Sequence, residues 1–284
     1  MNDNRKGLQH FILTRFNLLL WNKDKGGGKV RTLQWLEHRV ELFEKYCFPS
    51  VKSQSCQDFI WIVLFDSKTP DKYKARIEEY QKSCPQFIPV FVTPQNGRYF
   101  AEVFRQEIVK RLVAERVLTT YLDNDDALSI GFIKDLQTRA LSASFGTIIN
   151  YNDGYQFYTD HKYLMRIHYP KNHFVSVVER GYPATVKGIF GYGGHYYLDT
   201  IKGVRIERVM DKPLWCEVIH GKNMVNDAYF IDAKMVRDAD KLRNEFAIDE
   251  DVRYGAWLYL FRYMPRYVKT FFVRVKHRLF GWEW

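Results

Sequence analysis

The chain has 284 residues, of which 46% are hydrophobic, 27% charged and 17% aromatic. This composition can form a sizeable core and excludes a largely disordered protein. No run of about 18 uncharged apolar residues occurs in the chain, and residues 1–7 are polar and charged. Neither a membrane-spanning helix nor a secretion signal is therefore predicted.

The cysteines favour a cytoplasmic location. There are four of them, and they form neither a CxxC pair nor any other spacing typical of a zinc site. Reduced, mostly structural thiols are expected from such a pattern, and these are typical of the cytoplasm. The four are Cys47, Cys56, Cys84 and Cys216.

The first half of the chain alternates between apolar runs and segments with helical spacing. One apolar run expected to form a strand begins at His10, and three more cover residues 59–65, 87–92 and 117–122. The segments with helical spacing are 32–46, 71–82, 99–114 and 129–141, and a glycine-rich loop is expected at 23–29. Strands that are apolar on both faces and alternate with helices predict an α/β fold with a mostly parallel central sheet flanked by helices.

The fourth of these strands ends in three carboxylates within four residues, Asp123, Asp125 and Asp126. Residues two apart in an extended segment project to the same side, so Asp123 and Asp125 are predicted to face one cation. Mg²⁺ is commonly held by one or two carboxylates together with the phosphates of a substrate. The pattern therefore indicates a metal and diphosphate site. Asp residues also form turns and helix caps, so Asp126 could instead cap the helix that follows.

Two further polar residues are expected at the same edge of the sheet. Arg15 ends the first apolar run and Asp66 ends the second. In open α/β sheets, ligands bind outside the carboxyl ends of the strands. Both side chains are therefore predicted to lie near the acidic cluster, and an ordinary surface or loop role is the alternative for each.

The second half of the chain has a different rhythm, with short strands rich in Tyr, His and Gly from residue 146 to about 206. Asp153 lies in this part, before Gly154, and an Asp-Gly pair between strands is also typical of a hairpin turn. The glycines within 188–194 predict a bend of the backbone. Glu217 and His220 follow in an apolar, strand-like run.

Three landmarks occur in order along the chain. They are Thr14–Asn17, Leu122–Leu128, and Trp215–Gly221 followed by Asn223 and Asn226. In this combination, the chain resembles the rhamnosyl transferase family of bacterial glycosyltransferases, over roughly residues 8–245. The middle landmark resembles the DxD motif of GT-A enzymes. Tyr121 is a departure, because many relatives have Arg there, and the donor contacts would differ if that Arg binds the donor.

The resemblance implies a GT-A-like fold and a metal-dependent glycosyltransferase. The enzyme would transfer a sugar, with rhamnose as one option, from a nucleotide-sugar donor to a glycan or lipid-linked acceptor in bacterial surface polysaccharide synthesis. Mn²⁺ or Mg²⁺ held by Asp123 and Asp125 would stabilise the departing diphosphate. In GT-A enzymes a late His often completes the metal shell, which makes His220 the third candidate ligand. A buried structural histidine is the alternative for His220.

The remaining donor and catalytic roles follow from the same resemblance. Arg15 would bind a phosphate, because a guanidinium fork matches its oxygens. Asp66 would bind the base or ribose, and Asp126 is expected to contact the donor beside Asp123. If the reaction inverts the anomeric centre, a carboxylate must act as general base, and the two candidates are Asp153 and Glu217.

Residues 252–284 form a basic aromatic extension that follows the catalytic domain at 8–245. The extension holds seven Lys or Arg residues and one Glu, so its net charge of +6 is more than half of the chain's +10. Mixed cationic and aromatic residues suit the interface of an anionic bilayer, which predicts a peripheral location at the inner face of the cell membrane. Two short helices, divided at Pro265 and packed on the catalytic domain with their charges solvated, are the alternative.

Two other classes of function fit part of the sequence. A sequence pI of about 9.3 and the aromatic extension also suit a non-enzymatic protein that binds nucleic acid or a membrane. Recognition of nucleic acid does not call for a carboxylate cluster at a strand end, so no nucleic-acid partner is expected. A metal phosphohydrolase could use Asp123 and Asp125, but its nucleophilic Asp would usually lie on the first strand.

Overall fold

A computed structural model describes residues 7–18, 20, 32–201, 203–220 and 233–258, and the pairs 260–261, 264–265, 268–269, 271–272 and 275–276. The loop expected at 23–29 lies outside these residues. So do the landmark residues Gly221, Asn223 and Asn226.

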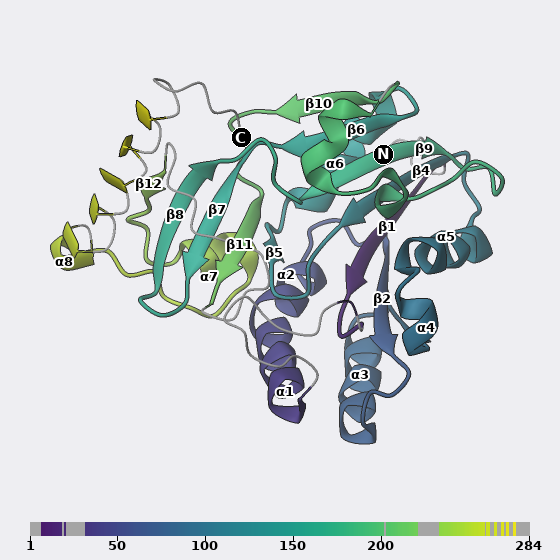
Figure 1. Cartoon of the computed structure of the whole chain (residues 1–284), viewed down its shortest axis with the longest axis horizontal. Helices are drawn as coiled ribbons and strands as arrows, with labels where there is room; N and C mark the ends of the chain where they lie inside the picture. Colours follow the sequence, from purple (N-terminus) through teal and green to yellow (C-terminus); the bar gives the residue numbers. More distant parts are fainter. Residues whose placement is uncertain are drawn as a thin grey trace.

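The larger of two sheets has seven strands, in the order β10-β6-β9-β4-β1-β2-β3 (Figure 1). Their bounds are β1 (Leu8–Arg15), β2 (Ile60–Asp66), β3 (Phe87–Val92), β4 (Arg116–Tyr121), β6 (Thr147–Tyr151), β9 (Val175–Arg180) and β10 (Arg205–Val209). Strands β4, β1, β2 and β3 run parallel, whereas β9 is antiparallel to both of its neighbours. The mostly parallel sheet and the first four strands predicted from the sequence are confirmed.

Helices cover both faces of this sheet. One face packs against the helical segments α1 (Leu33–Leu42), η2 (Phe43–Cys47), α2 (Phe48–Lys52), α3 (Asp71–Ser83) and α6 (Phe132–Ser142). The other face packs against α5 (Phe100–Arg111), which follows α4 (Pro94–Gly97), and against the 3₁₀ turns η3 (Ile189–Tyr192) and η4 (His195–Thr200). The helix expected at 32–46 continues to Lys52 through a π-helical turn, because Tyr46, Cys47 and Val51 bury their side chains in the core.

The second sheet has five strands, in the order β12-β8-β7-β11-β5, and was not predicted as a separate sheet. Its strands are β5 (Ala127–Leu128), β7 (Asp153–Tyr158), β8 (Tyr163–His168), β11 (Trp215–Ile219) and β12 (Lys234–Met235). Helix α7 (Lys241–Phe246) packs on one of its faces through Leu242 and Phe246. The short helix α8 (Ala256–Leu258) follows α7 in the chain.

The interpretation of Asp153 and Gly154 as a hairpin turn is wrong, because both residues lie within β7. Strand β6 ends at Tyr151 in the first sheet, and β7 begins at Asp153 in the second, so the chain changes sheets at Asn152. Gly154 lies inside β7 against Trp215, where an added Cβ would be only 2.1 Å from the indole ring. The glycine is therefore needed for close packing and not for a turn.

The chain also changes sheets between β4 and β5, at residues 122–126. Strand β4 belongs to the first sheet, and β5 pairs with β11 in the second. The acidic cluster thus lies on the connection between the two sheets. Among the helices of the described residues, none has the length and apolar character needed to cross a bilayer.

Candidate active site

The acidic loop, residues 122–126 between β4 and β5, is fixed against the carboxyl end of β1. The Asn124 side chain donates hydrogen bonds to the backbone oxygens of Arg15 (3.1 Å) and Phe16 (2.7 Å). Strand β2 is tied to the same edge through Asn17, whose side-chain oxygen accepts a hydrogen bond from the backbone N–H of Asp66 at 3.0 Å. The ends of β4, β1 and β2 therefore meet at one edge, as the sequence predicts.

Asp123 is the most accessible of the three carboxylates, with 28% of its side chain exposed. The Tyr121 hydroxyl donates to its Oδ2 at 2.7 Å, and Arg15 Nη2 lies 3.5 Å from its Oδ1. Tyr121 also accepts a hydrogen bond of 2.5 Å from Arg15. The residue that departs from the family pattern therefore links the arginine of β1 to the first carboxylate of the loop.

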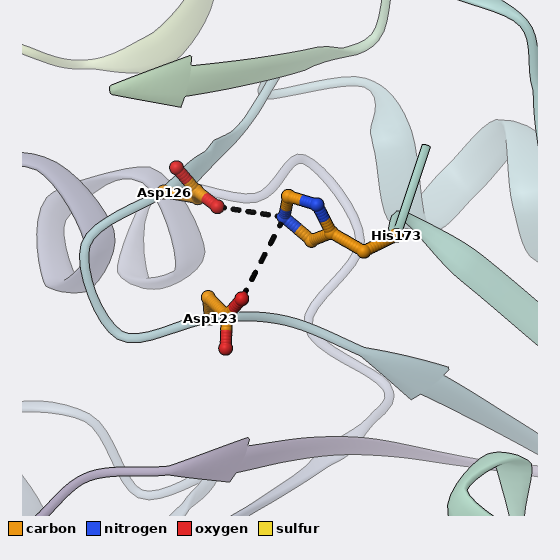
Figure 2. Close-up of side chains that lie close together, drawn as sticks. All are labelled: Asp123, Asp126 and His173. Atoms are coloured by element: carbon orange, nitrogen blue, oxygen red, sulfur yellow. Dashed lines mark hydrogen bonds and ion pairs between the residues drawn. The ribbon is translucent and has the colours of Figure 1, made fainter. Parts of the chain in front are cut away.

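Asp126 is fully buried beside a histidine that the sequence analysis did not single out. His173 Nε2 lies 2.7 Å from Asp126 Oδ2 and 3.8 Å from Asp123 Oδ2 (Figure 2). The other Asp126 oxygen accepts from the backbone N–H of Val218 on β11 at 2.9 Å. The helix-cap alternative for Asp126 is wrong, because β5 follows it and α6 begins only at Phe132.

The direction of β9 brings His173 to the site. Because β9 is antiparallel to β4, it begins where β4 ends, and His173 lies two residues before it. The His173 ring stacks on Phe174 (centroids 4.3 Å apart), and Phe174 stacks on Trp215 (4.7 Å). These contacts hold the imidazole over the acidic loop.

Burial and ion pairing act in opposite directions on this pair. Burial raises the pKa of Asp126, and the hydrogen bond from His173 only partly offsets that effect. Burial alone would lower the pKa of His173, but the hydrogen bond to Asp126 and the nearby charge of Asp123 raise it. A protonated His173 therefore faces carboxylate oxygens when no cation is bound.

Asp123, Asp126 and His173 fit a divalent cation. Each offers one ligand atom, and the three atoms all lie within 4.8 Å of one another. Two carboxylate oxygens suit Mg²⁺ and Mn²⁺, while an imidazole nitrogen also suits softer transition metals such as Zn²⁺. The donor set therefore matches Mn²⁺ well.

Asp125 has different partners from Asp123. Its Oδ2 lies 2.5 Å from Arg39 Nη1 and 2.9 Å from His220 Nε2. Burial would raise the pKa of Asp125, but Arg39 and His220 hold it below its usual range. Strand β4 ends at Tyr121, so the alternation expected of an extended segment does not apply to the loop. The structure brings His220 to Asp125, with an arginine already paired to the same oxygen, and the role of His220 and Asp125 as metal ligands stays a prediction.

Of the two candidates for general base, Glu217 lies closer to the loop. It is buried on β11, next to Val218, whose N–H binds Asp126, and Gln156 donates to its Oε2 at 2.5 Å. Burial raises the pKa of Glu217 to about 7, and the nearby positive charge of His173 offsets only part of that rise.

Asp153 is held elsewhere on the second sheet. His168 Nδ1 lies 2.7 Å from its Oδ1, and the backbone N–H of Asp211 donates to its Oδ2 at 2.7 Å. Gln156 pairs with Glu217 across β7 and β11. Asp153 begins β7, three residues before Gln156, and so lies roughly 10 Å away at the usual rise per residue.

Asp66 shapes the turn after β2. It is 5% exposed, and its Oδ1 accepts from the backbone N–H of Lys68 at 2.7 Å.

His195, on η4, is a second histidine that the sequence analysis did not single out. Its ring lies 5.8 Å from that of His173, and burial lowers its pKa to about 3, with the charges of His173 and Arg15 acting in the same direction.

These features define a class of protein: an α/β fold that presents carboxylates and an arginine at the carboxyl edge of its sheet, where α/β proteins bind nucleotides. The chain belongs to the family described as Putative rhamnosyl transferase, whose model matches residues 9–229. It is a glycosyltransferase by family, and the α/β fold with a mostly parallel central sheet predicted from the sequence is confirmed. No curated protein matches the chain.

Solved structures also match at low sequence identity. The crystal structure of S. aureus TarS residues 1–349 in complex with UDP is 13% identical, with a TM-score of 0.43, over 74% of this chain and 60% of that one. A 4-diphosphocytidyl-2C-methyl-D-erythritol synthase is 14% identical, with a TM-score of 0.32, over 78% of this chain and 93% of that one. The chain thus spans less than two thirds of the TarS chain.

Proposed function

We propose that this protein transfers a sugar, with rhamnose as the first candidate, from a nucleotide-diphosphate donor to the hydroxyl of a glycan or lipid-linked acceptor. The family match carries this proposal. The acidic loop at the carboxyl edge supports it, because a leaving nucleoside diphosphate needs concentrated positive charge, and this loop can hold a cation beside Arg15.

The donor lies across the ends of β4, β1 and β2 in this proposal. Arg15 meets the diphosphate next to Asp123. Asp66 lies two strands from β4, roughly 10 Å away, which suits contact with the nucleoside while the phosphates lie at the loop. Asp126 then faces the part of the donor nearest the second sheet.

Two ligand sets for Mn²⁺ or Mg²⁺ share Asp123. The spacing in the sequence predicts Asp125 as one partner and the family resemblance implies His220 as the other, whereas the distances favour Asp126 and His173. We propose the second set, because Arg39 already neutralises Asp125. A bound divalent cation would supply Lewis-acid stabilisation of the leaving diphosphate.

Glu217 is the proposed general base. It lies on the second sheet, across the acidic loop from the donor strands, and the acceptor hydroxyl would approach from this side. Its raised pKa, about 7, suits a group that must take up a proton near neutral pH. Asp153 stays the alternative base, in which case the acceptor would approach from the amino-terminal end of β7.

The setting of the reaction belongs to the same proposal. Surface polysaccharide synthesis uses glycan or lipid-linked acceptors, so an enzyme in this pathway would benefit from contact with the inner face of the cell membrane. Arg253, Lys269 and Lys276 in the extension are exposed. They support a peripheral attachment to anionic lipid, which attracts basic segments.

A donor screen tests the proposal. The purified protein is incubated with UDP-, GDP- and dTDP-sugars, Mn²⁺ and bacterial glycan or lipid-linked acceptors, and release of nucleoside diphosphate is measured. We expect release with at least one donor and loss of release in Asp123→Asn. Hydrolysis of simple phosphate esters without sugar transfer would instead favour a phosphohydrolase. Protection by oligonucleotide alone would favour a nucleic-acid binder.

A further inference from the structure

Arg15 is surrounded by aromatic rings. Its guanidinium carbon lies 4.9 Å from the ring centroid of Phe100, 5.2 Å from that of Tyr121 and 5.1 Å from that of Phe190. Its Nε is buried and has no hydrogen-bond partner. A guanidinium usually takes its orientation from its five N–H donors, but here ring faces replace several of those contacts. The direction of Arg15 therefore depends on where the rings lie.

Phe190 is the ring that arrives from the most distant segment of the chain. It lies on η3, stacks on Phe104 (5.1 Å, interplanar angle 13°) and packs edge-on against Phe100 (5.2 Å, 89°). It also lies 4.7 Å from Tyr121, whose hydroxyl joins Arg15 to Asp123. Phe190 thus contacts Phe100 and Tyr121, the other two rings around the Arg15 guanidinium.

A buried carboxylate holds the turn that carries Phe190. Glu179, on β9, accepts from the backbone N–H groups of Lys187 (3.0 Å) and Gly188 (2.8 Å) and from the Tyr192 hydroxyl (3.1 Å). The Thr119 hydroxyl on β4 accepts from the backbone N–H of Ile189 at 2.8 Å. The turn is therefore fixed at both ends to the strands that lead to the site.

The backbone at Gly188 shows how closely the turn is seated. Its φ is +71°, a conformation that favours glycine, and an added Cβ would lie 3.0 Å from Ile108. The bend that the sequence predicts at 188–194 is thus an anchored turn with a defined inner face. Its Phe190 side chain points into the aromatic cluster between α5 and β4.

We propose that Phe190 is a positioning residue for Arg15 and that Glu179 sets its place. The chain of contacts runs from Glu179 through the turn to Phe190, then to Arg15 and to the oxygen atoms of Tyr121 and Asp123. It keeps the Arg15 charge aimed at the diphosphate subsite before a donor binds. This inference rests on the proposed function only in assigning the diphosphate as the group that Arg15 meets.

A double-mutant cycle tests the inference with nucleoside diphosphates and Mn²⁺, measured by calorimetry. Phe190→Leu keeps an apolar side chain but removes the ring face, and we expect it to weaken diphosphate binding about 3- to 30-fold, the loss expected for one desolvated cation–π contact. Phe190→Tyr should retain binding. In an Arg15→Gln background, where no cation faces the ring, Phe190→Leu should add little. An equal loss in both backgrounds would overturn the proposal.

Phe145 provides a matched control, because its ring lies 4.4 Å from both Arg116 and Arg180, away from the acidic loop. Phe145→Leu should leave diphosphate affinity unchanged. Glu179→Gln is a second route to the same loss, because it replaces one accepting oxygen with an N–H group facing backbone donors. It also serves if Phe190→Leu folds poorly.

A readout without ligand separates this inference from the proposed function. The Arg15 Nε–H resonance, assigned by its disappearance in Arg15→Lys, should lie upfield in the parent protein because of the three rings. Phe190→Leu should move it downfield and speed its exchange with water. An unchanged resonance would overturn the inference even if diphosphate binds, and the expected shift would uphold it even if no diphosphate binds.

Discussion

At the scale of single residues, the burial of Glu217 controls its chemistry. Burial raises its pKa to about 7, so it holds its proton below that pH and loses it above. A general base works only when deprotonated. Turnover is therefore expected to rise as the pH passes through 7 and to level off above it.

Glu217→Gln removes the basic oxygen and keeps an oxygen able to accept from Gln156. We expect turnover to fall by roughly 10²- to 10⁴-fold, the usual contribution of general base catalysis, with diphosphate affinity unchanged. Initial rates across pH 5.5–9 and calorimetry on the same preparations provide the measurement. If Asp153→Asn shows the loss and Glu217→Gln does not, Asp153 is the base.

The chemistry of the site could be predicted from residue types, but the pairing of its residues could not. Three carboxylates within four residues at the end of a buried strand indicate a candidate cation site. Which carboxylate meets Arg39 and which meets His173 depends on how the loop leaves β4, and spacing in the sequence does not contain that information. A lone histidine before an apolar strand, as at His173, offers a weak signal that could have been followed.

At the scale of elements, a buried polar chain crosses three strands of the first sheet. His10 Nε2 on β1 lies 2.8 Å from the Thr120 hydroxyl on β4, which lies 2.8 Å from the Ser176 hydroxyl on β9. Burial lowers the pKa of His10 to about 3, against about 6.5 in an unfolded chain. The stability that depends on a neutral His10 is therefore fully present above pH 6.5. This part of the free energy of unfolding is lost as the pH falls toward 3.

His10→Gln should remove this pH dependence. Below pH 6.5, the free energy of unfolding of the parent should fall by up to about 1.4 kcal/mol per pH unit more steeply than that of the variant. Urea unfolding at pH 7.5, 6.5, 5.5 and 4.5 measures both slopes. Parallel curves for the two proteins would show that His10 is charged, or absent from the core, in the folded state.

The regular part of the fold was predictable because its strands are apolar on both faces and alternate with helices. Strand β2 is buried along most of its length, as expected for the interior of a parallel sheet. The reversal of β9 and the division into two sheets were not predictable. Short strands rich in Tyr and Gly carry no signal of which neighbour they pair with, and β6 and β7 are separated by one residue yet lie in different sheets.

At the scale of the whole molecule, the extension displays apolar side chains that the core does not cover. Trp257 and Phe261 are 75% and 61% exposed, and their rings stack 4.6 Å apart. Leu258 and Met264 pack against the main core cluster. Apolar rings beside a net charge of +6 suit an anionic bilayer, while the same charge disfavours contact with a second copy of the extension.

Vesicle sedimentation tests this surface. The protein is expected to bind phosphatidylglycerol vesicles, to bind phosphatidylcholine vesicles much less, and to be released by salt. Trp257→Ser with Phe261→Ser should reduce binding, whereas Tyr99→Ser with Val113→Ser, which removes exposed apolar side chains elsewhere, should not. Equal binding to both lipids, preferred binding to an oligonucleotide, or concentration-dependent dimers through the extension would contradict this prediction.

In the proposed mechanism, the acidic loop holds a cation through Asp126 and His173, and this cation is needed to bind a nucleoside diphosphate. Asp126→Asn and Asp125→Asn offer a matched pair, since each removes one charge from neighbouring residues and keeps an oxygen able to accept the existing hydrogen bond from Val218 or Arg39.

Calorimetric titration of Mn²⁺, followed by nucleoside diphosphate, tests both roles of the loop. We expect diphosphate to bind only when Mn²⁺ is present. Asp126→Asn should weaken Mn²⁺ binding by at least the roughly 10- to 100-fold typical of disturbed metal sites, with a much smaller change for Asp125→Asn. Diphosphate binding that needs no metal, or a loss confined to Asp125→Asn, would contradict this mechanism.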